Sequence, residues 1–281
     1  MKIIDAHVHV YSPEIEKNRD KIAATERWFD ILSGSPFQKW GTAEDLIAAM
    51  DRDGIETSIV TGFAFYDQGL CREVNDYVLD AAKRYPGRIL PMAVVSPTRP
   101  GAEAEIARCA ELGAVGVGEL FPDGQLFDIS DARQTWRLAG ACGERGLFVM
   151  FHTAEQVGHQ YPGKGAYGAE HAAKFCLNHP EAEVIFAHFG GGLWAYEAMP
   201  EMRQVLSNAW YDTAAWPWLY GPQVMDSIFA IGAGHKILYG SDWTILAYPR
   251  YAKLLSETNL DEKMTNALLY ENIDRLLSRS D

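Results

Sequence analysis

The feature that most constrains the fold is an alternation, along the whole chain, of short apolar runs with longer stretches whose apolar residues recur at helical spacing. The runs that predict strands are 3–10, 57–63, 89–95, 115–121, 147–153, 184–189, 210–214 and 237–243. Most are almost continuously apolar, as expected for parallel strands that are covered on both faces. Eight such strands alternating with helices predict an α/β fold, a single (β/α)8 TIM barrel over residues 1–281 as one domain.

Capping residues at the expected helix ends support the prediction of helices in these stretches. Thr42 followed by Asp45 resembles a capping box at a helix start, and Gly54 stands where a helix-ending glycine belongs. The alternative, a doubly wound nucleotide-binding sheet, more often has a glycine-rich phosphate turn after its first strand, and the sequence contains no GxGxxG or GxxxxGK[ST] pattern. The alternation therefore favours the barrel.

Composition excludes several classes of protein. The formal net charge of −13, without clustered Lys or Arg, argues against nucleic acid as a partner. No segment approaches the ~20 apolar residues of a membrane span, so we expect a cytoplasmic enzyme that does not bind membranes. Four widely spaced cysteines form no CxxC pair and are expected to be reduced core residues: Cys71, Cys109, Cys142 and Cys176.

The strongest chemical signal is a pair of histidines in the first predicted strand. His7 and His9 are two residues apart, so both side chains should face the same side, into the barrel near the C-terminal end of the strand. Two imidazoles held in this way suit a divalent metal. Hydrogen-bonded core histidines are the alternative interpretation.

Three further polar residues directly follow apolar runs. His152 ends the fifth predicted strand, His188 the sixth and Asp242 the eighth. The C-terminal strand ends of a barrel meet at one face, where barrel enzymes place their active sites. Burying such groups without partners costs several kcal/mol each, so a shared metal is the economical explanation for their convergence.

These motifs resemble those of the amidohydrolase superfamily, in particular the amidohydrolase 2 (amidohydrolase-related) branch, which includes both decarboxylases and lactonases. The resemblance covers nearly the whole chain and rests on His7-Val8-His9, Phe151-His152-Thr153, residues 187–191, Tyr211-Asp212-Thr213, residues 240–243 and Glu271-Asn272. It implies that the metal ligands are His7, His9, His152 and Asp242. It also implies that His188 is either the catalytic imidazole or a ligand of a second ion.

Glu119 departs from the decarboxylase pattern. It ends the fourth predicted strand, where other amidohydrolases carry a metal-bridging lysine or glutamate. If it points inward it could ligate or bridge metals, which would favour hydrolysis; a salt-bridged carboxylate outside the ligand set is the alternative. Asp212, at the end of the seventh strand, is either a partner of a ligand or a helix cap.

The expected function is that of a metal-dependent hydrolase acting on an ester, lactone or amide of a small, aromatic or carboxylated substrate. The cofactor is one or two divalent ions, with zinc expected and manganese as the alternative, because such an ion lowers the pKa of bound water to ~7. Asp242 would then shuttle the proton and His188 would polarise the carbonyl.

Two other functions remain open. A non-oxidative decarboxylase could use the same site on an aromatic or muconate-type carboxylic acid, with Arg27 or Arg250 holding the acid. A non-catalytic metal-binding protein fits less well, because structural zinc sites are closed and usually rich in cysteine.

Tryptophans and other aromatic residues gather in the predicted connections at the C-terminal face, which indicates either a subunit interface or an apolar pocket for a small-molecule substrate. The residues proposed to contact substrate are Trp28, Trp216, Trp243 and Arg250. Long connections at 11–41, 154–169 and 215–222 are candidate lids or substrate walls. The resemblance also permits a homodimer.

Overall fold

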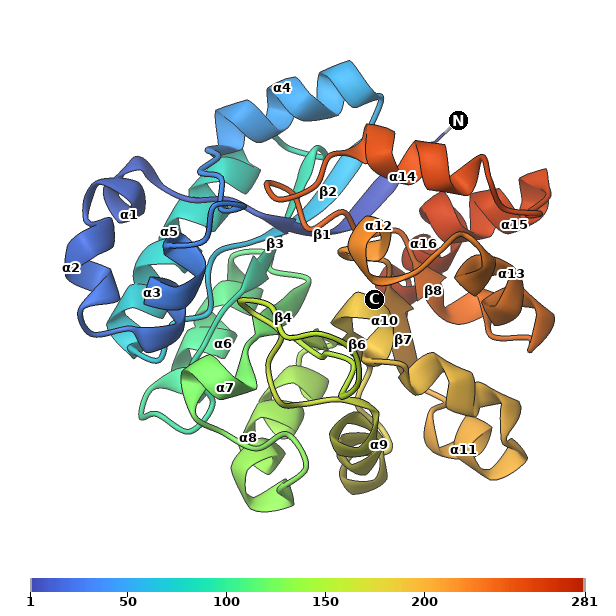
Figure 1. The fold of residues 1–281 in the computed structure, drawn as a ribbon. Coiled ribbons are helices and arrows are strands. Elements are labelled where there is room, and N and C mark those ends of the chain that lie inside the picture. Colours follow the sequence, from blue (N-terminus) through green and yellow to red (C-terminus); the bar gives the residue numbers. More distant parts are fainter. Residues whose placement is uncertain (1, 280–281) are drawn as a thin grey trace.

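The computed structural model describes residues 2–279. Its eight parallel strands form one sheet in sequence order. The strands are β1 (Ile4–His9), β2 (Thr57–Thr61), β3 (Ile89–Ala93), β4 (Gly116–Leu120), β5 (Phe148–Phe151), β6 (Val184–Phe186), β7 (Ala209–Asp212) and β8 (Ile237–Leu238). Figure 1 shows the helices arranged around these central strands. The predicted barrel is confirmed, and each of the eight predicted segments contains a strand, but β6 ends at Phe186 and β8 at Leu238, several residues earlier than predicted.

Helices connect the strands and cover the outside of the barrel. They are α1 (Pro13–Lys17), α2 (Arg19–Ala23), α3 (Arg27–Ser33), α4 (Ala43–Asp53), α5 (Gln68–Arg84), α6 (Ala102–Glu111), α7 (Pro122–Gln125), α8 (Ala132–Gly143), α9 (Ala169–Asn178), α10 (Ala187–Gly190), α11 (Pro200–Val205), α12 (Trp216–Leu219), α13 (Gln223–Ala230), α14 (Tyr248–Leu255), α15 (Glu262–Asn266) and α16 (Asn272–Leu277), with the short helices η1 (Leu193–Ala198), η2 (Gly234–Lys236) and η3 (Ala267–Glu271). Within residues 2–279, no helix is long and apolar enough to cross a membrane.

Local predictions for α4 and the cysteines are also confirmed. The Thr42 side chain accepts a hydrogen bond from the Asp45 amide, and the Asp45 side chain accepts one from the Thr42 amide. Gly54 ends the helix in the left-handed conformation, with φ of 73°. All four cysteines are buried and free.

The segment after β8 closes the barrel against β1. The Ala6 amide donates to the Tyr239 carbonyl oxygen at 2.8 Å, and the His9 amide donates to that of Trp243 at 2.7 Å. The Asp242 amide in turn donates to the His7 carbonyl oxygen at 2.9 Å. Closure therefore brings the carboxylate of Asp242 beside the histidines of β1, although the two are far apart in the sequence.

A bulge in β1 decides which side chains face inward. The register moves from Asp5 opposite Ser58 to Val8 opposite Val60, so β1 contains one residue more than β2 over this stretch. Before the bulge, Ala6 packs in the apolar cluster that the strands form with α16. After it, Val8 packs in the cluster shared with the surrounding helices. The alternation thus changes phase, which turns His7 and His9 toward the barrel centre.

A second bulge, in β4, has the same effect on Glu119. The register moves from Val117 opposite Val149 to Leu120 opposite Phe151, leaving Gly118 and Glu119 opposite a single residue. Gly118 has φ of 146°, and a Cβ atom there would collide with the carbonyl oxygen of Met150. Glycine is therefore required beside Glu119.

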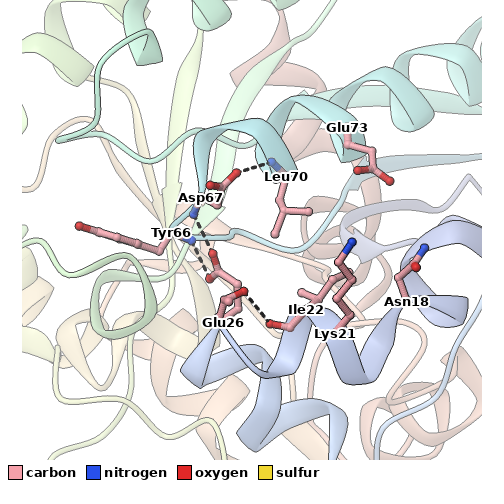
Figure 2. A pocket seen from close by; sticks show the side chains of 9 residues that line it. Asn18, Lys21, Ile22, Glu26, Tyr66, Asp67, Leu70 and Glu73 are labelled. Atoms are coloured by element: carbon pink, nitrogen blue, oxygen red, sulfur yellow. Dashed lines mark hydrogen bonds between the residues drawn. The ribbon is translucent and has the colours of Figure 1, made fainter.

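The connection after β1 forms three helices, α1 to α3, whose apolar residues Ile15, Ile22 and Phe29 pack in a small cluster shared with the segment after β2 and with α5. The buried Glu26 carboxylate joins this segment to the start of α5. It accepts hydrogen bonds from the Tyr66 amide at 2.9 Å and the Asp67 amide at 2.8 Å. Figure 2 shows Glu26 beneath these two residues. All three line a surface cavity of 570 Å³.

We expect Glu26→Ala to destabilise the protein by about 1–3 kcal/mol, because two backbone amides lose their acceptor. Residues 11–41 should also exchange their amide hydrogens faster. Glu73→Ala is the matched control, since Glu73 lines the same cavity but is exposed. Urea unfolding and hydrogen exchange measure both effects. Equal behaviour of the two variants would show that Glu26 does not anchor the segment.

Candidate metal centre

His7 and His9 point the same ring atom toward one another. Their Nε2 atoms lie 3.0 Å apart. The Nδ1 atom of His7 contacts Oδ2 of Asp212 at 2.8 Å, and Nδ1 of His9 contacts the carbonyl oxygen of Gly62 at 3.3 Å. Because a carboxylate and a carbonyl oxygen only accept hydrogen bonds, both Nδ1 atoms carry a proton.

This arrangement leaves two unprotonated Nε2 atoms facing each other when both imidazoles are neutral. Their lone pairs repel at 3.0 Å unless a proton or a cation lies between them. Asp242 adds a carboxylate oxygen 3.8 Å from Nε2 of His9. His7 and His9 therefore provide the nitrogen donors in the tautomer that a divalent cation needs, and Asp242 provides the negative charge.

Glu119 lies among four histidines. Its Oε2 atom is 3.6 Å from Nε2 of His7 and 3.5 Å from Nε2 of His9. Its Oε1 atom is 3.0 Å from Nδ1 of His152 and 3.3 Å from Nε2 of His188. One carboxylate thus faces a different pair of imidazoles with each oxygen.

The candidate ligands form two groups. In each group the ligand atoms lie within 4.8 Å of one another: His7, His9 and Asp242 in the first, and Glu119, His152 and His188 in the second. The structure therefore brings together all six residues predicted to bind metal, but His152 lies with Glu119 rather than with His7 and His9. The buried Nε2 atom of His152 has no hydrogen-bond partner, which is unusual for a buried polar atom.

Burial and charge strongly perturb the titration of this cluster. Burial alone would lower the pKa of His7, but Asp212 and Glu119 raise it well above its ordinary value. Burial also opposes protonation of His188, yet its hydrogen bond to Glu119 and the charge of that residue raise its pKa to about 9. Burial raises the pKa of Glu119, but His7 and His152 hold it well below its usual range. Without metal, these shifts favour protonated His7 and His188 beside an ionised Glu119.

Asp212 holds the two sides of the centre together. Besides contacting His7 with Oδ2, it accepts hydrogen bonds through Oδ1 from the amides of His188 and Ala214, each at 2.9 Å. Nδ1 of His188 contacts the Ala214 carbonyl oxygen at 3.1 Å, so His188 also presents Nε2 to the centre. Asp212 is therefore both a partner of a candidate ligand and a cap for a turn.

Two of the candidate residues have left-handed backbone conformations. The φ angles are 56° for His188 and 57° for Asp242. Such angles are uncommon for residues other than glycine and persist where surrounding contacts hold them. Here those contacts are two hydrogen bonds: the His188 amide donates to the Asp212 carboxylate, and the Asp242 amide donates to the His7 carbonyl oxygen.

A cavity of 150 Å³, here called the inner cavity, opens onto the centre. Its wall includes both the candidate ligands and side chains from the three long connections predicted to be lids or walls. The ligands that line it are His9, Glu119, His152, His188 and Asp242. The other side chains include Tyr11, Leu32, Gln38, Tyr161, Trp218 and Ile245.

The four residues predicted to contact substrate lie outside this lining. Trp28 packs on the edge of Phe121, and Trp216 is buried against Phe189. Trp243 lies against Gly41, and Arg250 is exposed on α14. The predicted connections thus contribute to the cavity wall through other side chains than these four, because loops lack the periodicity that shows which residues face inward.

The fold resembles several solved structures over almost the full length of both chains. The 5-carboxyvanillate decarboxylase from Sphingomonas paucimobilis has a TM-score of 0.79 at 13% identity, covering 99% of each chain. A probable 2-pyrone-4,6-dicarboxylic acid hydrolase from Acinetobacter baumannii has a TM-score of 0.67 at 18% identity, covering 99% of this chain and 100% of the other.

A dihydroxybenzoic acid decarboxylase from Polaromonas sp. JS666, solved with bound manganese, has a TM-score of 0.74 at 17% identity and covers 100% of this chain and 98% of its own. No curated protein sequence matches the chain. The model of the amidohydrolase family, however, matches residues 4–279. The chain therefore belongs to the amidohydrolase family of metal-dependent enzymes.

Proposed function

We propose that this enzyme is a hydrolase that uses divalent metal to cleave an ester, lactone or amide. The observation that carries the proposal is the convergence of three imidazole Nε2 atoms on one carboxylate. His7, His9 and His188 each use Nδ1 in a hydrogen bond and direct Nε2 toward Glu119. Without a cation, protons must lie between these Nε2 atoms and their neighbours. A protonated Nε2 atom cannot bind a metal, so cations and protons compete for the same positions.

We expect the first group, His7, His9 and Asp242, to hold one ion and the second group to hold another, with Glu119 between them. Zinc is the proposed metal because the donors are imidazole and carboxylate. Manganese is the alternative, and a neighbour in fold contains it. A divalent ion there supplies a Lewis acid that lowers the pKa of water and polarises a carbonyl.

The side chains around the inner cavity have distinct proposed roles. Asp242 lines the cavity and can accept a proton from the attacking water, then return it to the leaving group. With a single bound ion, Nε2 of His188 is free to donate a hydrogen bond to the substrate oxygen on which charge develops. With two ions, His188 is a ligand instead, so metal stoichiometry decides its role.

Decarboxylation is the second candidate, favoured by the similarity in fold to the 5-carboxyvanillate decarboxylase. Glu119 and the cavity wall argue for hydrolysis. In the described part of the chain, neither Arg27, Arg250 nor any other arginine or lysine lines the inner cavity to hold an acid. The metal itself would have to take that role.

Metal content provides the first test. We expect about two equivalents of zinc or manganese per chain in the wild type, and about one in Glu119→Gln, which loses the bridging charge. His7→Ala should lose metal from the first group while keeping its fold. His235→Ala is the control, since His235 is exposed and remote from both groups. The wild type is reconstituted with metal, dialysed and measured by elemental analysis. Less than ~0.3 equivalents of metal per chain would reject the proposal.

The reaction itself is tested by measuring acid release and carbon dioxide release from one panel of esters, lactones and aromatic acids. We expect acid release, and a fall in kcat of about 100-fold or more in Asp242→Asn, because the proton acceptor is lost. Metal content of the variant must be measured alongside. Carbon dioxide release without ester or lactone cleavage would identify a decarboxylase.

Metal binding should release protons. His188, with a pKa raised to about 9, and His7, with a pKa raised well above its ordinary value, are protonated in the metal-free protein at pH 7 and must lose those protons to bind a cation. Apparent zinc affinity should therefore rise with pH up to about 9. Calorimetry in two buffers of different ionisation enthalpy measures the release. Identical heats in the two buffers would mean that the histidines are neutral before binding.

A further inference from the structure

A second cavity of 340 Å³, here called the outer cavity, adjoins the inner one. The two share a wall that includes Leu32, Tyr161, Trp218 and Ile245. The inner cavity is about the size that accommodates one benzene-sized group. The outer cavity is at the lower end of the usual range for small-molecule sites. Together they form one route from the surface to the candidate metal ligands.

In the described part of the chain, lysine and arginine side chains are missing from this route. Across residues 2–279, no lysine or arginine lines either cavity. Lys164 follows the lining residue Gly163, but its ammonium group is buried and donates hydrogen bonds to the carbonyl oxygens of Val157 at 2.7 Å and His159 at 3.0 Å. An anionic group away from the metal would therefore have no ammonium or guanidinium counter-charge, and the imidazole that lines the outer cavity, that of His159, is exposed to solvent.

Aromatic side chains at the rim point to an apolar ligand. Phe37 and Trp218 line the outer cavity and pack together with ring centroids 5.5 Å apart. They remain 61% and 45% exposed, which is unusual for side chains of this size. A ligand that fills the outer cavity would cover both rings.

From these observations we infer that the substrate is an uncharged ester or lactone with apolar groups on both sides of its carbonyl, one ring-sized group in the inner cavity and the other reaching Phe37 and Trp218. This inference rests on the proposed hydrolysis. In that reaction the oxygen of water bonds to the carbonyl carbon, the bond from that carbon to the ester oxygen breaks, and a proton from water passes to the departing oxygen. The substrate is therefore neutral, and the product released from it that carries a net negative charge is the ionised acid.

Binding tests the inference without relying on turnover. The probes are 4-acetylbiphenyl, a neutral ketone that water cannot cleave, and the same molecule with a carboxylate on its distal ring. We expect the zinc-loaded protein to bind the ketone at least about tenfold more tightly in calorimetry. Equal binding of the two probes, tighter binding of the carboxylate, or no binding of the ketone would overturn the inference.

Variants locate the binding site. Trp218→Ala should weaken ketone binding several-fold, whereas Trp136→Ala, which removes an exposed tryptophan from α8, should leave it unchanged. Ser35→Lys places a cation in the outer cavity and should strengthen carboxylate binding. Ser33→Lys adds the same charge on the same segment outside the lining and serves as the control. If Ser35→Lys and Ser33→Lys have equal effects, the distal group does not lie in the outer cavity.

A matched pair of esters separates failure of this inference from failure of the proposed function. The pair is 4-nitrophenyl 3-phenylpropanoate and its ring-carboxylated counterpart, with the ring carboxamide as a neutral control of similar size. We expect kcat/KM to fall at least about tenfold for the carboxylate but much less for the carboxamide. Faster cleavage of the carboxylate overturns only the substrate class. Failure to cleave any ester, lactone or amide overturns the hydrolase proposal, while the ketone measurements still decide the ligand class.

Discussion

The candidate centre depends on the buried carboxylate of Asp212. One carboxylate oxygen is hydrogen-bonded to the imidazole of His7, and the other accepts hydrogen bonds from the backbone amides of His188 and Ala214. Three strand ends, those of β1, β6 and β7, are thereby fixed relative to one another. Because an imidazole that donates from Nδ1 must present Nε2 on its other side, the same hydrogen bonds that stabilise the barrel mouth also orient the lone pairs that a metal would use.

The identity of the chemical groups was predictable because each follows an apolar run, and strand ends meet at one face of a barrel. His7, His9, His152, His188 and Asp242 all lie at that face. Their orientation was less predictable. Strict alternation would place Ala6 and His7 on opposite sides of β1, and only the bulge turns both inward. A bulge depends on pairing with the neighbouring strand, which one strand's sequence does not reveal.

The cavity wall was the least predictable part of the molecule. Its side chains come from connections without regular spacing, and their positions depend on contacts such as the Glu26 carboxylate with the start of α5. Tryptophan content suggested an apolar pocket, but packing decides which tryptophan reaches it: Trp216 is buried in the core, while Trp218, two residues later, lines the cavity. The absence of lysine and arginine from the two described cavities could not be predicted, because the chain contains 25 of these residues and the sequence does not show which of them line a cavity.

The sequence by itself determined the eight-stranded barrel, the family to which the chain belongs, and the residues from which a metal centre could be built, because apolar periodicity and strand-end chemistry are local properties. Only the tertiary structure decided that the ligands divide into two groups around Glu119, that Asp212 orients His7 and His188, and that within residues 2–279 no lysine or arginine lines the approach. These features arise from distances between distant strands and loops, and those distances are set by the closure of the barrel and the packing over its mouth.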